Sequence, residues 1–244
     1  QASCLVTGVS RTLIQSSTLI DGCGGAGLRF SNPSSTYLTV SGTQDVKIVA
    51  LKITGDTSNT VRSNWPAIGV YNSNHVDVLR NTIELVNGAG ILYGNSADGM
   101  IEGNYISATL ADGIHVTNGA AATAQTNCRN IKVRGNHIYK PGDDGIATVS
   151  YGGNDLPCDG VMATDNDIVS GSTAGYTNAG SRNVEFTGLV RDLQGLNAVR
   201  VEEDTAYVTF KPENTRLDLM VENPSSTGVL IGRNAFNTKG SVNV

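Results

Sequence analysis

The chain has 244 residues, 16 % of them charged, and a formal net charge of −5. This acidic balance argues against nucleic acid as a partner, because nucleic acid is normally bound by a basic surface. No apolar run approaches the roughly 20 residues that a membrane-spanning helix needs. Helical periodicity is scarce, whereas glycine, asparagine, serine and threonine are abundant, and this composition favours short strands joined by turns.

Short segments of alternating apolar and polar residues recur along the chain and predict strands. The earliest are less regular and lie at 18–22 and 27–30. The more regular segments begin near residues 46, 75, 99, 130, 160 and 183, and two further strands are expected at 206–210 and 217–221. We expect each regular segment to lead through a turn into a second strand.

A fixed register relates four segments of different length. Four asparagines are each followed two residues later by isoleucine: Asn81, Asn104, Asn136 and Asn166. The eighth residue after each asparagine precedes a glycine, and these residues are Ala89, Asp112, Asp144 and Ala174. A constant frame with variable insertions is typical of the stacked coils of a solenoid. We therefore predict one solenoid domain over residues 1–244, and the lack of an obvious cap favours a piece of a longer chain.

Stacking assigns structural roles to three columns of residues. The asparagines are expected to form a ladder of side-chain amides, and the isoleucines to pack the core. Cys128 and Cys158 each lie eight residues before a ladder asparagine, so they share a column on neighbouring coils. Strands about 4.8 Å apart allow a disulfide there, and a pair of buried thiols is the alternative. The pairing of Cys4 and Cys23 stays open, because their register is not fixed.

The acidic residues of two neighbouring coils form a candidate catalytic cluster. Stacking brings Asp112 and Asp144 face to face, with Asp143 beside them. Two close carboxylates do not both ionise cheaply, so one should have a raised pKa, as the general acid of a glycoside hydrolase requires. The same cluster suits Ca²⁺, and aspartates before glycine are also common turn residues. Catalysis, turn structure and metal binding all remain open from the residues alone.

The segment 136–151, with the sequence Gly-Asp-Asp-Gly-Ile at its centre, resembles the double-aspartate coil of polygalacturonase-like glycoside hydrolases in the pectate-lyase-like superfamily. The segment 111–114 is similar to the Asn-Thr-Asp-Gly motif that precedes it in that family. The resemblance implies a right-handed parallel β-helix, with Asp112, Asp143 and Asp144 as acid and water-activating base of an inverting reaction. Phage tailspike depolymerases have similar coils and usually form trimers, so the resemblance also allows a homotrimer.

The chain departs from that family in the coils that follow. The family's Gly-His-Gly and Arg-Ile-Lys motifs are missing at 173–176 and 194–197. The resemblance therefore extends to the β-helix frame and the aspartates but not to pectin as the substrate.

Residues near the aspartates are candidates for substrate contact. His115, three residues after Asp112, is a candidate proton carrier or an exposed surface residue. Lys140 is a candidate for binding an acidic sugar, with solvated surface as the alternative. Tyr93, Tyr151 and Tyr176 follow the glycine column and are candidates for stacking on sugar rings.

Three functions are consistent with these observations. The first is hydrolysis of a polysaccharide by the aspartates, without a cofactor but with Ca²⁺ as a candidate ion. The second is a uronate lyase or epimerase in which His115, Tyr151 or Lys140 moves the proton. The third is a non-catalytic tailspike or surface-binding shaft. All three place the protein outside the cell, either secreted or on a virion surface.

Overall fold

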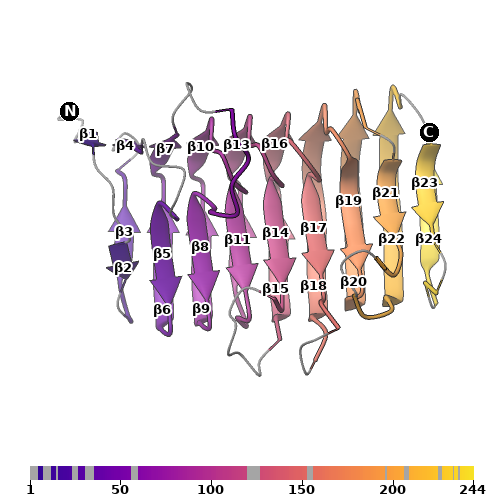
Figure 1. The fold of residues 1–244 in the computed structure, drawn as a ribbon, viewed down its shortest axis with the longest axis horizontal. Helices are drawn as coiled ribbons and strands as arrows, with labels where there is room; N and C mark the ends of the chain where they lie inside the picture. Colours follow the sequence, from indigo (N-terminus) through magenta and orange to yellow (C-terminus); the bar gives the residue numbers. More distant parts are fainter. Residues whose placement is uncertain are drawn as a thin grey trace.

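The structure is a computed structural model, and it describes residues 5–7, 12–14, 16–23, 27–30, 36–55, 60–119, 127–152, 156–195, 197–205, 209–224, 227–232, 234–235 and 237–244. The described strands pair in parallel, coil upon coil, so that the chain advances along one axis from the N-terminal to the C-terminal end (Figure 1). The predicted stacked-coil architecture is therefore correct. No described helix is long and apolar enough to cross a membrane.

Each coil contributes one strand to each of three faces. The first face contains β3 (Leu19–Asp21), β6 (Gln44–Val49), β9 (Asn74–Leu79), β12 (Met100–Glu102), β15 (Arg129–Arg134) and β18 (Asp159–Val169). The second contains β1 (Leu5–Thr7), β4 (Gly27–Arg29), β7 (Lys52–Thr54), β10 (Thr82–Glu84), β13 (Tyr105–Ser107) and β16 (His137–Tyr139). The third contains β2 (Thr12–Ile14), β5 (Leu38–Ser41), β8 (Ile68–Tyr71), β11 (Ile91–Gly94), β14 (Ile114–Thr117), β17 (Ile146–Val149), β19 (Ala174–Ala179), β21 (Asn197–Val201) and β23 (Thr227–Ile231).

The first and second faces merge in the C-terminal part of the helix. The first half of β18 pairs with β15 and its second half pairs with β16. The continuing strands of the merged face are β20 (Arg182–Arg191), β22 (Glu213–Glu222) and β24 (Lys239–Asn243). The third face keeps its separate strands from β2 to β23.

The interior is filled by columns of like side chains. The isoleucine column is confirmed, because Ile83 pairs with Ile106, Ile106 with Ile138 and Ile138 with Ile168, all fully buried. Burying a side chain of this size contributes about 1.5–3 kcal/mol. The column fixes the register of each coil on the next, because a slip of one residue would turn every isoleucine outward.

The asparagine column forms the predicted ladder. The Oδ1 atom of Asn104 accepts hydrogen bonds from the backbone N–H of Asn81 at 2.9 Å and from its side-chain amide at 3.0 Å. The Nδ2 atom of Asn104 donates to Asn136 Oδ1 and to the Val78 carbonyl, both at 2.9 Å. Each buried turn thus satisfies its polar groups through the coils beside it.

The two core cysteines share a column, as predicted, and both are free thiols. Their flanking residues Arg129 and Asp159 pair across β15 and β18, and both cysteines are fully buried. The Cys128 Sγ lies 3.2 Å from the carbonyl oxygens of both Tyr93 and Thr117, so either can accept its single S–H proton. Of the two predicted possibilities, the structure shows the stacked pair of buried thiols and not the disulfide.

The other cysteines do not settle their proposed pairing. Cys23 is an exposed free thiol, and Cys4 lies outside the described residues.

The ladder predicts a large stability effect at Asn104. Asn104→Ala leaves the Asn81 N–H, the Asn81 amide and the Val78 carbonyl without this partner, so the free energy of unfolding should fall by about 2–4 kcal/mol. Urea denaturation followed by circular dichroism measures the change. Asn74→Ala, on an exposed position of β9, is the matched control and should lower stability by less than about 0.5 kcal/mol. Equal small losses in both variants would contradict the ladder's role.

Candidate active site

The third face carries a long open groove. Its volume is about 970 Å³, and the described residues that line it extend from the coil of β5 to that of β21. Six strand spacings separate these coils, so the groove is about 29 Å long at about 4.8 Å per coil. An extended groove across parallel strands suits a polymer better than a small compact ligand.

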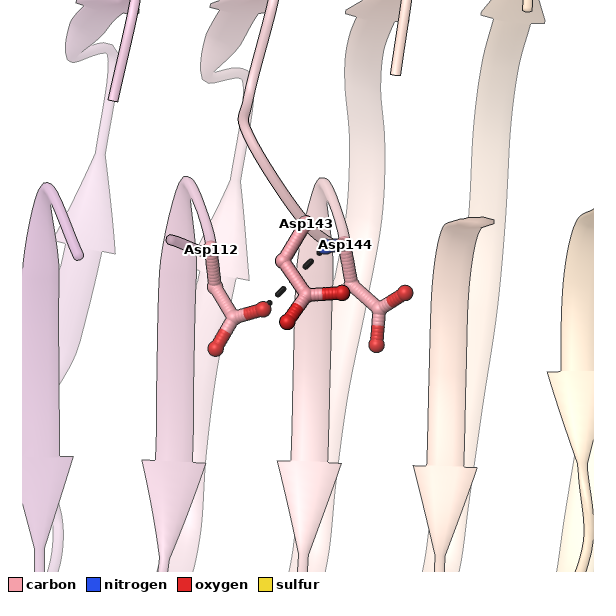
Figure 2. A group of neighbouring side chains, drawn as sticks. All are labelled: Asp112, Asp143 and Asp144. Atoms are coloured by element: carbon pink, nitrogen blue, oxygen red, sulfur yellow. Dashed lines mark hydrogen bonds between the residues drawn. The ribbon is translucent and has the colours of Figure 1, made fainter. Parts of the chain in front are cut away.

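Asp112 and Asp144 lie at equivalent turns on neighbouring coils, directly before β14 and β17. Ile114 pairs with Ile146 in the following strands, which fixes this column. The Asp144 N–H donates to Asp112 Oδ1 at 3.1 Å (Figure 2). The Ala174 N–H donates to Asp144 Oδ1, also at 3.1 Å. One oxygen of each carboxylate therefore holds the next coil.

The glycine that follows each aspartate is required by packing. A Cβ atom on Gly113 would lie 2.7 Å from the Gly145 carbonyl oxygen and 2.5 Å from Ile138 Cγ2. A Cβ on Gly145 would meet the Gly175 carbonyl oxygen at 2.6 Å. The close stacking that aligns the core therefore requires glycine at these positions. It also fixes the position of the aspartate that precedes each glycine.

Asp143 lies beside this column and is held by a residue from a distant coil. Arg62, from the segment between β7 and β8, places Nη2 2.7 Å from Asp143 Oδ2. Arg62 and its neighbour Trp65 both line the groove. Sequence reasoning missed them, because nothing in the repeat shows that this segment reaches forward to the coil of β17.

The three carboxylates form one electrostatic unit, which we name the carboxylate cluster (Asp112, Asp143 and Asp144). Each offers an oxygen within 4.8 Å of the others, and Figure 2 shows the three side chains projecting from two adjacent turns. Burial and the charges of Asp112 and Asp143 raise the pKa of Asp144 to about 7. Asp144 therefore keeps a proton up to about pH 7, while Asp143 forms an ion pair with Arg62.

His115 extends the cluster along the outer side of β14. Its Nδ1 lies 2.5 Å from Asp112 Oδ2, and it lines the groove. Burial acts to lower the pKa of His115, but the charge of Asp112 and its hydrogen bond outweigh burial and raise it. The Asp112 carboxylate therefore fixes the His115 ring at the edge of the cluster.

The three tyrosines predicted as substrate contacts lie in different places. Tyr151 lines the groove. Tyr93 and Tyr176 do not, because both are fully buried in the core, where their hydroxyls donate to the carbonyls of Val76 at 2.6 Å and Thr187 at 3.0 Å. Stacking of sugars on these two tyrosines is therefore wrong.

Lys140 is also away from the groove. It lies at the turn after β16, with Nζ 5.1 Å from the centre of the Tyr139 ring, and is not among the described groove residues. Its predicted role in binding an acidic sugar at this site is not supported by its position.

The cluster has the donor set that Ca²⁺ prefers, three carboxylates whose oxygens converge. Two of these carboxylates already have side-chain partners, since Arg62 binds Asp143 and His115 binds Asp112. A bound ion would have to compete with both. The negative charge of the cluster can therefore be balanced by Arg62, His115 and a proton on Asp144 as well as by a metal ion.

Comparison with known proteins identifies the fold. A family model described as "Right handed beta helix region" matches residues 1–189. No curated protein matches the sequence. The match, together with the parallel stacking, confirms the predicted right-handed parallel β-helix.

Solved structures with the same fold differ in sequence and in role. PfbA, a surface adhesin of Streptococcus pneumoniae, is similar with a TM-score of 0.68 at 9 % identity, over 98 % of this chain and 68 % of that chain. An alginate lyase from Paenibacillus sp. str. FPU-7 gives 0.57 at 13 %, over 96 % and 92 %. The A-module of the mannuronan C-5 epimerase AlgE6 from Azotobacter vinelandii gives 0.52 at 14 %, over 97 % and 88 %. At these identities the likeness shows the fold alone.

The raised pKa of Asp144 makes stability depend on pH. Between about pH 4 and pH 7 the folded protein keeps a proton that the unfolded chain releases, so the free energy of unfolding falls as pH rises, by about 2–4 kcal/mol in total. Asp144→Asn retains an oxygen for the Ala174 N–H but does not titrate. It should be more stable than the native chain at pH 8 and lose most of this slope.

Denaturation at a series of pH values measures this effect. Asp218→Asn, at an exposed carboxylate of β22, is the control and should retain the native slope. A slope that survives in Asp144→Asn would show that the proton is held elsewhere.

Proposed function

The chain belongs to the right-handed β-helix family, and from that premise we propose that it is a glycoside hydrolase that cleaves a polysaccharide lying along the groove. The observation that carries the proposal is the contrast within the carboxylate cluster. Asp144, with its raised pKa, is suited to donate a proton, and Asp143, paired with Arg62, is suited to act as a carboxylate. One protonated and one ionised carboxyl beside each other are what glycoside hydrolysis requires.

The proposed reaction assigns one role to each group. Asp144 donates its proton to the glycosidic oxygen as the bond from that oxygen to the anomeric carbon breaks. In an inverting route, water attacks the anomeric carbon and gives its proton to the Asp143 carboxylate. In a retaining route, Asp143 first bonds to the anomeric carbon, and the water that then displaces the Asp143 carboxylate gives its proton to Asp144, which became ionised in the first step. The cluster oxygens approach within 4.8 Å, and the anomeric configuration of the first product separates these two routes.

Asp112 acts as a positioning residue in this scheme. Its Oδ1 holds the backbone of Asp144 and its Oδ2 holds His115, so both of its oxygens are engaged. Its charge is also one cause of the raised pKa of Asp144. Replacing Asp112 should therefore act on the pH dependence of the reaction through Asp144.

A location outside the cell accords with this proposal. Polysaccharides of the length that fills the groove are found at cell surfaces and beyond them, and PfbA is a surface adhesin with the same fold. The same likeness supports a purely binding role as an alternative.

A second candidate is a lyase or epimerase acting on a uronate polymer. The His115–Asp112 pair favours it, because a held histidine can remove a proton next to a carboxyl group. The alginate lyase and the mannuronan epimerase show that the fold supports such chemistry elsewhere. Such an enzyme must also neutralise the uronate carboxylate, and both arginines of the groove, Arg62 and Arg200, are already bonded to carboxylates.

Degradation of a panel of neutral and acidic polysaccharides tests the proposal. We expect new reducing ends without the ultraviolet absorbance of unsaturated sugars, and an alkaline decline of kcat/KM with a midpoint near pH 7, where Asp144 loses its proton. Asp144→Asn should lower the rate at least about 100-fold, because a general acid contributes about 10²–10⁴. Asp218→Asn, remote from the groove, should retain the native rate.

The outcomes separate the candidates. Absorbance from unsaturated sugars would assign the site to a lyase, and altered uronate configuration without cleavage to an epimerase. No change in any glycan would contradict enzymatic function and support a binding shaft. Circular dichroism of Asp144→Asn must match that of the native chain for the loss of rate to be assigned to chemistry.

A further inference from the structure

A short irregular segment forms a wall of the groove beside the carboxylate cluster. This segment, residues 61–66, precedes β8, and we name it the groove wall. It is fixed on the turn of a later coil, because the Ser63 N–H donates to the Asn87 carbonyl at 2.8 Å. At its other contact, Arg62 Nη2 lies 2.7 Å from Asp143 Oδ2. The groove wall therefore reaches the cluster itself.

The groove wall carries an exposed tryptophan. Trp65 is the single tryptophan of the chain, it is 39 % exposed, and it lines the groove. Its backbone is packed closely on the next coil, because a Cβ atom on Gly88 would overlap the Trp65 carbonyl. The Ala67 N–H also donates to the Ala89 carbonyl at 2.9 Å. Large aromatic side chains are more often buried, so an exposed ring on fixed backbone at a groove is suited to ligand contact.

The tryptophan lies at the same end of the strands as the cluster. The column that begins on its carbonyl continues through Gly88, because the Ala111 N–H donates to the Gly88 carbonyl and the Asp143 N–H to the Ala111 carbonyl, both at 3.3 Å. Three coil steps thus separate the tryptophan from Asp143, about 14 Å at about 4.8 Å per coil. Ala89, Leu92 and Ala111 line the groove on the coils between them, so the floor there is largely apolar.

A second aromatic ring lies on the floor beside the groove wall. A Cβ atom on Gly69 would lie 2.5 Å from the Cε2 and Oη atoms of Tyr71, so the Tyr71 ring covers this glycine on the outer side of β8. The Tyr71 hydroxyl lies 3.4 Å from Thr36 Oγ1. Thr36 is followed by Tyr37, whose N–H donates to the Pro66 carbonyl at 3.2 Å. The ring therefore points back toward the groove wall, and the two aromatic side chains belong to the same part of the groove.

We propose that the groove wall forms a sugar subsite, in which the Trp65 ring stacks on the C–H face of one pyranose unit of a polysaccharide. The subsite lies on the N-terminal side of the carboxylate cluster, with Tyr71 and Leu92 on its floor. Aromatic faces and apolar floors supply contact area for such a face, while the sugar hydroxyls stay at the open side of the groove. The proposal rests on the proposed function only in taking the groove as the polysaccharide site, and it adds the residue that positions the polymer there.

Tryptophan fluorescence tests the proposal, because in this chain it reports on Trp65 alone. Asp144→Asn, which should bind without cleaving, is titrated with mannan, xylan, galactan, β-glucan, alginate and polygalacturonate, and binding is measured independently by affinity electrophoresis. We expect at least one polymer to retard the protein and to shift its emission. The same polymer should lower the acrylamide quenching constant by about 2-fold or more, because a stacked sugar covers the exposed ring.

A matched pair of substitutions tests the residue itself. Trp65→Ala, made in the Asp144→Asn chain, should raise the dissociation constant for that polymer at least about 10-fold, since the apolar contact area is lost. Tyr105→Ala is the control, because Tyr105 is also 39 % exposed but lies on the second face, outside the groove lining, and it should leave the dissociation constant unchanged. Circular dichroism of both variants should match that of the parent.

The outcomes separate this proposal from the proposed function. A polymer that binds without changing the emission or the quenching would overturn the subsite and leave hydrolysis standing. Protection of Trp65 by a polymer that the native chain does not cleave would support the subsite and contradict hydrolysis. Equal dissociation constants for Trp65→Ala and its parent would also overturn the subsite, and retardation by none of the six polymers would overturn both proposals.

Discussion

The parallel, in-register stacking of coils is the constraint on which the rest of this structure depends. Each coil repeats about 4.8 Å from the last, so residues of one column lie in contact whatever their chemistry. For isoleucine and asparagine this contact is favourable, through packing and through paired amides. For aspartate it is unfavourable unless one of the two carboxyls keeps a proton. The same geometry therefore produces the packed core, the asparagine ladder and the raised pKa of Asp144.

The aspartate column joins structure and chemistry in the same side chains. One oxygen of each aspartate accepts a backbone N–H of the next coil, as a turn residue would, and the other faces the groove or His115. Turn structure and catalysis are thus compatible roles of the same residues. The raised pKa is destabilising at neutral pH. It is tolerated because the isoleucine and asparagine columns on the same coils fix the backbone independently.

Most of the fold and the centre of the site could be predicted from the sequence, because residues at equivalent positions of the repeat lie beside each other on neighbouring coils. The asparagine, isoleucine and aspartate columns all follow from one frame. Tyr93 and Tyr176 were assigned to the wrong side, although Tyr93 lies two residues after the buried Ile91 and so must face inward with it.

The remaining groove residues were missed for two physical reasons. Arg62 reaches Asp143 through an irregular segment, and no local pattern encodes a contact across several coils. Arg200 lies in the same column as His115, through Ala147 and Thr177. The frame could not be extended that far, because Gly188 of β20 takes the place of the ladder asparagine beside Asn166.

The central claim is that Asp144 keeps a proton at neutral pH, and carboxyl ¹³C NMR titration of aspartate-labelled protein tests it most directly. The resonance that disappears in Asp144→Asn is thereby assigned to Asp144. This resonance should titrate with a midpoint near pH 7. A midpoint near the ordinary aspartate value of about 4 would contradict the account. In that case the stacked carboxylates would be ordinary turn residues.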